Sequence, residues 1–145
     1  MIQRFSFGHP IPTGSVEQAL PLCGGSVPFL TPAAEGWTYR MREDCVVYGL
    51  GEMPRGLNKR GWHYIANNTD ESHHTEDKLS YYGAHNFLLI RNGEDCFGLF
   101  VDFPGKVHYD IGYTRHDTLC FHTEEPDYEL YVPVSYTHLT LPTIR

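Results

Sequence analysis

The chain has 145 residues, 41% hydrophobic and 20% charged, which is the composition of one globular domain and excludes global disorder. Its net charge of −7 and its scattered basic residues exclude nucleic acid and anionic membranes as partners, because both require a concentrated basic patch. No apolar run has the length of a transmembrane helix, and the N-terminus lacks the apolar core of a signal peptide. We therefore expect a cytoplasmic protein with reduced thiols at its four separated cysteines, Cys23, Cys45, Cys96 and Cys120.

Short runs rich in aromatic and β-branched residues recur along the chain, and they predict strands at 3–7, 37–41, 45–50, 86–90, 96–101, 106–113, 118–122 and 128–132. The Gly- and Pro-rich stretch 14–34 predicts a surface loop, with at most a short helical turn at 16–20. Asn92-Gly93 is a strong hairpin signal between two of the strands. No segment has a sustained 3.6-residue apolar period, so the sequence predicts an all-β fold, an antiparallel β-sandwich.

The stretch 52–82 interrupts this rhythm with a long polar insert, "EMPRGLNKRGWHYIANNTDESHHTEDKLSYY". Long loops inside compact domains are often functional, so the chemistry of the protein is expected here. Within it, His73, His74, Glu76 and Asp77 are residue types that bind metals. Adjacent histidines point in different directions, and no second cluster completes a ligand set. We expect solvated polar side chains, no metal and no cofactor.

Carboxylate catalysis is the next hypothesis, because glycoside hydrolysis needs two carboxylates across one bond. The paired acids fall mostly at predicted turns, where charge is ordinarily solvated: Glu43-Asp44, Glu76-Asp77, Glu94-Asp95 and Glu124-Glu125. Asp70 differs, because it follows Asn67, Asn68 and Thr69 inside the insert. Amides and a carboxylate can bond sugar hydroxyls, and an Asx-turn explains the same residues equally well.

Nucleophilic catalysis has weaker support. Cys45, Cys96 and Cys120 lie within apolar strand patterns, which predicts buried, inert thiols. The chain has no G-x-S-x-G elbow and no phosphate-binding glycine loop. The "GLGE" at 49–52 has only two glycines and is interpreted as a turn at a strand end.

Five segments together resemble the N-terminal domain of glycoside hydrolase family 31, the family of α-glucosidases and α-xylosidases. They match in order and approximate spacing: "VYGLGEMPRGLNKRG" (47–61), "NNTD" (67–70), "YYGAHNFLL" (81–89), "FGLFVDFP" (97–104) and "YDIGYT" (109–114). The resemblance extends over about 37–132. Each motif alone is weak, but the set is specific.

This resemblance implies a galactose-mutarotase-like sandwich that packs against a (β/α)8 barrel carrying the catalytic aspartates. It implies that one sandwich loop lines the sugar pocket, and Asp70 matches the family's sugar-contacting acid. Asn68 and Thr69 are weaker substrate-binding candidates. No residue matches a catalytic aspartate, so we expect a fragment that is inactive alone. The parent is expected to be a retaining α-glucosidase acting on oligosaccharides.

The end of the chain, "PVSYTHLTLPTIR", reads differently from what precedes it. Back-translated in one frame, 133–143 resembles the transposase adapter used to prepare sequencing libraries. We therefore expect a native domain over 1–132 and a non-native tail over 133–145.

Two other interpretations stay open at this point. A free-standing carbohydrate-binding sandwich would use an exposed aromatic platform, for which Trp62, Tyr64, Tyr81 and Tyr82 are the candidates. An aldose-epimerase-like enzyme would use histidine and glutamate, but that fold needs a larger sheet than this chain can build. This sequence does not distinguish glucose from xylose, or α-1,4 from α-1,6 linkages, because the resemblance implies that most of the sugar pocket is in the barrel.

Overall fold

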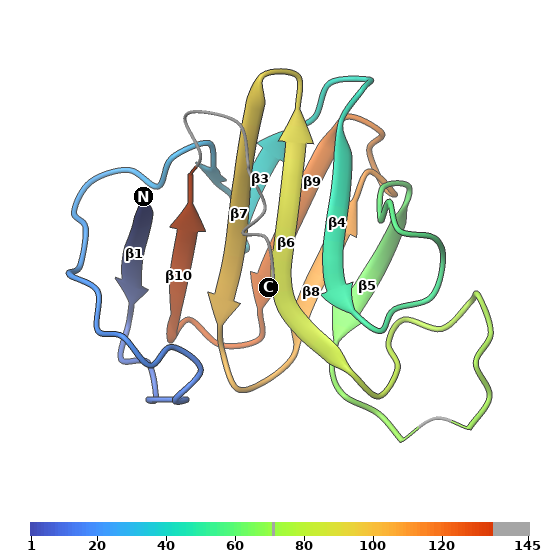
Figure 1. Ribbon diagram of the computed structural model, residues 1–145, viewed down its shortest axis with the longest axis horizontal. Coiled ribbons are helices and arrows are strands. Elements are labelled where there is room, and N and C mark those ends of the chain that lie inside the picture. The colour runs from blue at the N-terminus through green and yellow to red at the C-terminus, as the bar shows by residue number, and fades with distance from the viewer. Residues whose placement is uncertain (71, 135–145) are drawn as a thin grey trace, which may run out of the picture.

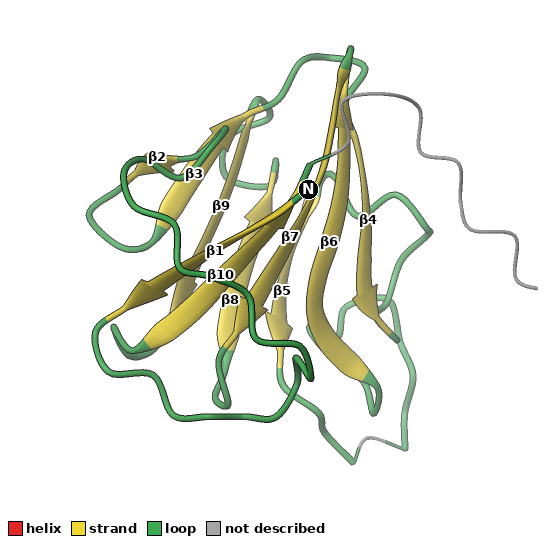
Figure 2. Cartoon of the chain, turned by 60° about the vertical axis from the view of Figure 1, so that its left-hand side comes forward, coloured by secondary structure: helices red, strands yellow, loops and turns green. Residues whose placement is uncertain are grey.

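The computed structural model describes residues 1–70 and 72–134, which form ten strands in two facing sheets (Figures 1 and 2). The strands are β1 (Ile2–Phe7), β2 (Thr31–Pro32), β3 (Trp37–Arg40), β4 (Val46–Gly51), β5 (Trp62–Ala66), β6 (Ala84–Asn92), β7 (Asp95–Asp102), β8 (Val107–Ile111), β9 (Thr118–Thr123) and β10 (Tyr128–Pro133). The described part of the chain contains no helix with the length and apolar character needed to span a membrane.

Both sheets are antiparallel. The first has the strand order β1-β10-β7-β6-β4, and the second has the order β2-β3-β9-β8-β5. This confirms the predicted all-β antiparallel sandwich. The predicted pairing of the strands on either side of 115–117 is also confirmed, as β8 with β9.

The polar insert expected as a loop over about 52–82 contains one strand. β5 lies inside it and pairs with β8, with Tyr64 opposite Tyr109. Tyr64 and Ala66 point into the core, but polar neighbours on both sides hide this short alternation in the sequence. The stretch 14–34 likewise contains the two-residue strand β2, and 16–20 form no helical turn.

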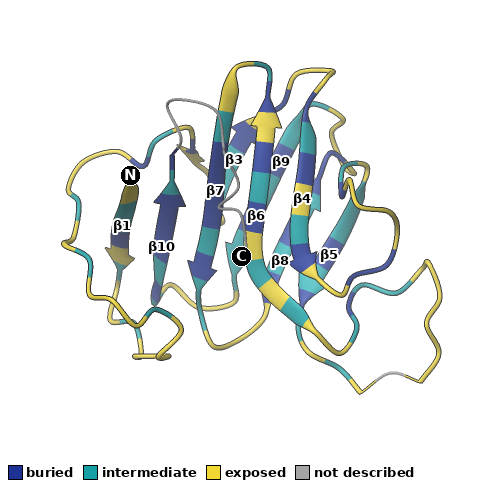
Figure 3. Ribbon diagram, viewed as in Figure 1, coloured by how far each residue is buried: buried dark blue, intermediate teal, exposed yellow. Residues whose placement is uncertain are grey.

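The core lies between the two sheets and is built largely by alternate residues of the longer strands (Figure 3). Leu88 and Ile90 of β6 are fully buried, and so are Ile111 and Leu119 of the opposite sheet. Removing each such side chain from water contributes about 1.5–3 kcal/mol. This burial sets the register, since a slip by one residue would turn every core side chain toward solvent.

The Asn92-Gly93 hairpin between β6 and β7 is confirmed. Asn92 pairs with Asp95, so Gly93 and Glu94 form a two-residue turn. Gly93 has a φ of 63°, which suits the first central residue of a type II′ turn. Asn92 itself stays in the strand, so its side chain is not needed in the turn and can form hydrogen bonds elsewhere.

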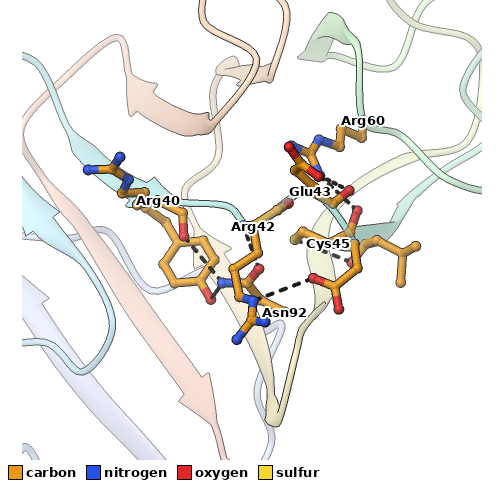
Figure 4. A network of polar contacts seen from close by, with 9 residues as sticks. Arg40, Arg42, Glu43, Cys45, Arg60 and Asn92 are labelled. Atoms are coloured by element: carbon orange, nitrogen blue, oxygen red, sulfur yellow. Dashed lines mark hydrogen bonds and ion pairs between the residues drawn. The ribbon is translucent and has the colours of Figure 1, made fainter.

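Asn92 ties the hairpin to the point where the chain crosses from one sheet to the other (Figure 4). Its Oδ1 accepts the Arg42 backbone N–H at 2.7 Å, and its Nδ2 donates to the Tyr39 hydroxyl at 2.7 Å. Arg60, which lies in the polar insert, also bonds to this crossing. Its guanidinium donates to the carbonyl oxygens of Arg42 at 2.6 Å and Cys45 at 3.2 Å. These bonds fix the backbone of the connection between β3 in one sheet and β4 in the other.

The last strand continues past the expected boundary at Val132. β10 ends at Pro133, and Val134 exchanges backbone hydrogen bonds with Met1, at 2.9 Å from its N–H and 3.2 Å to its carbonyl oxygen. The rest of the expected non-native tail, 135–145, lies outside the described residues, so its origin stays a prediction.

Candidate functional site

The polar insert runs along an edge of each sheet. Its first part follows β4, where the Lys59 N–H donates to the Val47 carbonyl at 2.7 Å and the Asn58 Oδ1 accepts the Val47 N–H at 3.1 Å. Its last part follows β5, where the Ile65 N–H donates to the Leu79 carbonyl at 3.1 Å. The insert is thus anchored at both ends by backbone groups of the sandwich.

The predicted sugar-contacting residues follow β5 directly. The Thr69 N–H donates to the Tyr81 carbonyl at 3.2 Å, and the Ser80 hydroxyl donates to the Asn67 carbonyl at 2.6 Å. Thr69 is half-buried, whereas Asn68 and Asp70 are exposed. The backbone leading to Asp70 is therefore held in place while its carboxylate faces solvent, a geometry that suits a binding residue.

The cluster around His73 is a set of exposed polar side chains. The His74 ring stacks on Tyr81 with centroids 4.6 Å apart, and the Thr75 hydroxyl donates to the Asp77 carboxylate. That hydrogen bond holds the pKa of Asp77 below its ordinary value. Within residues 1–70 and 72–134, no three His, Cys, Asp or Glu side chains are arranged to hold a metal ion.

The paired acids are exposed, and they lie in the β3–β4 crossing, the polar insert, the β6–β7 hairpin and the β9–β10 turn. Charges at such turns were expected from the sequence to be solvated, and the exposure of these acids agrees with that.

The cysteines are only partly as predicted. Cys45 is buried, but Cys96 and Cys120 are half-buried, because they occupy outward-facing positions of their strands. Burial raises the pKa of the Cys45 thiol, and it does the same for Cys120. A raised pKa disfavours the thiolate, the reactive form, so the structure lends no support to a cysteine nucleophile.

The four candidate aromatic residues do not form one platform. Tyr64 is 1% exposed and belongs to the core, where burial raises its pKa to about 12. The Trp62 ring is covered by the Arg55 guanidinium at 3.6 Å. Tyr82 is exposed and lies in the insert, where the His74 ring contacts it edge-on.

A groove of about 540 Å³ opens at the end of the sandwich where β5 and β7 end and β6 begins. These strand ends lie toward the bottom of Figure 1. We call this groove the end groove. Its polar and aromatic lining includes Asn68, His85, Asn86, Phe100, Asp102 and Phe103. Sequence reasoning missed it, because separate segments of the chain contribute its walls and none carries a local pattern.

The described residues thus form an antiparallel sandwich with a polar insert along one side of both sheets. Residues 27–110 match the family model described as the glycosyl hydrolase 31 N-terminal galactose mutarotase-like domain. The chain therefore belongs to glycoside hydrolase family 31, through its N-terminal domain. This match includes Asp70 and most of the residues that carry the resemblance.

Solved structures agree with this fold. A family 31 dextranase from Flavobacterium johnsoniae aligns with 77% of this chain, at 22% identity and a TM-score of 0.57. A cycloalternan-degrading enzyme from Trueperella pyogenes aligns with 69%, at 19% identity and a TM-score of 0.52. A cycloalternan-forming enzyme from Listeria monocytogenes aligns with 71%, at 17% identity and a TM-score of 0.58.

At these identities the comparisons show a shared fold. The aligned part spans 14%, 13% and 10% of the three solved chains, respectively. No curated protein sequence is significantly similar to this chain.

Proposed function

We propose that this chain is the N-terminal domain of a retaining α-glucosidase, acting in the cytoplasm on terminal α-linked glucose of oligosaccharides. The family match over 27–110 carries the proposal, because it includes the exposed Asp70 on an anchored backbone. In this proposal the domain supports a (β/α)8 barrel and supplies one loop to its sugar pocket.

Asp70 would act in binding and not in the chemical step. A carboxylate accepts hydrogen bonds from sugar hydroxyls, and fixing the sugar in this way orients the scissile bond for the catalytic aspartates of the barrel. Such a barrel typically takes about 250 residues. By itself the chain is therefore expected to release no glucose from maltose or isomaltose.

The outer face of the first sheet is the surface we propose for the barrel. Ile2, Tyr48 and Phe87 expose 51%, 40% and 37% of their surface. A shallow apolar hollow between Phe87, Leu89 and Pro133 continues the same face. The solved family members are several times longer than this chain, so the remainder of such a protein must pack on the domain somewhere.

The test of Asp70 uses the full-length parent. Replacing Asp70 by Ala should weaken substrate binding by about 1–3 kcal/mol, the range for a hydrogen bond to a charged group. Steady-state kinetics should show most of this loss as a raised KM. Glu76→Ala is the matched control, because Glu76 is an exposed acid of the same insert and should leave KM unchanged. Unchanged kinetics in Asp70→Ala would remove Asp70 from the site.

The end groove favours a second candidate, a free-standing carbohydrate-binding module. The nucleotide sequence that follows the codon for Val132 separates the two candidates. An in-frame continuation into a barrel with the family's aspartates supports the glucosidase domain. A stop codon at that point supports the module.

A further inference from the structure

We infer that the end groove is itself a binding site for a neutral oligosaccharide, with a lining that includes Asn68 of the insert but not Asp70. This inference rests on the second candidate under the proposed function, a carbohydrate-binding sandwich, and it adds the site and the chemical class of the ligand. The groove has about 540 Å³, within the range of about 300–1,000 Å³ that is typical of small-molecule sites. Its walls come from both sheets and from the N-terminal loop.

Asn86 is a positioned donor in this groove. Its Oδ1 accepts a hydrogen bond from the Tyr109 hydroxyl at 3.3 Å. Tyr109 is 2% exposed, and burial raises its pKa, so the phenol keeps its proton and remains a donor. Because this bond occupies the amide oxygen, the Nδ2 group is left to donate to a ligand. A core residue thus sets the direction of a surface amide.

His85 and Asp102 supply a second donor and an acceptor. The His85 Nδ1 accepts the Phe87 N–H at 3.3 Å, so the neutral ring carries its proton on Nε2. One oxygen of Asp102 accepts the Thr13 hydroxyl at 2.6 Å, which orients the carboxylate and leaves its other oxygen available. Sugar hydroxyls donate and accept at once, so they match a wall that offers both.

The remaining lining selects against anionic ligands. Phe100 and Phe103 offer apolar surface to the C–H groups of a sugar ring. The described residues that line the groove include no Lys or Arg, and they include Asp102. A phosphorylated or carboxylated ligand would meet a like charge and no counter-charge, which is unfavourable. The ligand class is therefore a neutral saccharide, of roughly two or three units for this volume.

The test is a ¹⁵N NMR titration of the 145-residue chain with isomaltotriose and with maltotriose. Saturable shifts are expected at 67–68, 84–86 and 100–105, with millimolar affinity. Asn86→Asp is the sharp variant, because it keeps an acceptor for Tyr109 and removes the Nδ2 donor. It should weaken binding by about fivefold or more. Arg91→Ala, an exposed change on the same strand, should leave the affinity unchanged.

Other outcomes would overturn the inference. Absence of saturable shifts, or shifts that survive Asn86→Asp unchanged, would do so. A tighter interaction with glucose 6-phosphate would contradict the neutral class. Loss of all shifts in Asp70→Ala would assign the binding to the insert, which refutes the groove and leaves the proposed function intact. Conversely, groove binding that persists in Asp70→Ala stands even if Asp70 proves silent in the parent.

Discussion

Asn92 shows how one polar side chain can secure a junction between sheets. It is 7% exposed, and it bonds the backbone of the β3–β4 crossing and a core hydroxyl. Its second Nδ2 bond, to the Arg40 carbonyl at 3.3 Å, uses both amide protons. Buried polar groups are tolerated when every partner is satisfied, and this residue meets that condition.

Replacing Asn92 by Ala should lower the free energy of unfolding by about 1–3 kcal/mol, because the Arg42 N–H and the Tyr39 hydroxyl lose their partner. Urea denaturation followed by tryptophan fluorescence would measure the change. Arg91→Ala, one residue earlier and exposed, should stay within about 0.5 kcal/mol of the original chain. Equal stability of the two variants would show that the junction does not depend on Asn92.

At the scale of elements, the end of β4 has an unusual backbone conformation. Its register against β6 shifts between Gly49 and Gly51, and both glycines have positive φ, 128° and 73°. Leu50 between them also has a positive φ, 65°, and is fully buried. The "GLGE" motif is thus a bulge close to the end of β4, because Gly51 still pairs with Ala84 beyond the register shift. The sequence-based interpretation as a turn at a strand end placed it correctly near the end of the strand but missed that the pairing resumes.

Gly49→Ala is expected to destabilise the domain by at least about 1–3 kcal/mol, the cost of holding a residue in a sparsely populated conformation. An added Cβ would also lie 2.1 Å from the Phe87 carbonyl oxygen. Thermal unfolding monitored by circular dichroism would report the loss. Gly56→Ala is the control, because a Cβ there meets nothing within 4 Å. A Gly49→Ala variant as stable as the control would mean that the bulge can relax.

For the whole molecule, the exposed apolar face of the first sheet should govern behaviour in solution. Contiguous apolar patches of this kind promote association. We expect the isolated chain to self-associate as its concentration rises and Phe87→Lys to reduce this, as measured by sedimentation velocity. Leu57→Lys is the control, because Leu57 is 85% exposed in the polar insert, outside that face. A chain that stays monomeric at high concentration would count against the face as a docking surface.

The sequence predicted most strands, because alternation and hairpin signals are local properties of the chain. It did not reveal β5, whose short alternation is surrounded by polar residues. It also did not reveal the end groove, which forms only when distant segments such as 11–15 and 100–105 meet. Asp70 was proposed through its family motif, since its neighbours alone fitted an Asx-turn equally well. The fold could therefore be predicted from local sequence patterns. The groove could not, because it depends on contacts between segments that are far apart in the sequence.

The polar insert has a consequence beyond any ligand. β4 and β5 are edge strands, one in each sheet, and unpaired strand edges are templates for aggregation. The first part of the insert occupies the open backbone groups of β4 at Val47, and its last part occupies those of β5 at Ile65. One segment thus covers the edge strand on the same side of each sheet. Mutations that shorten it would cost the protein solubility as well as the loop that carries Asp70, so selection for either property preserves the other.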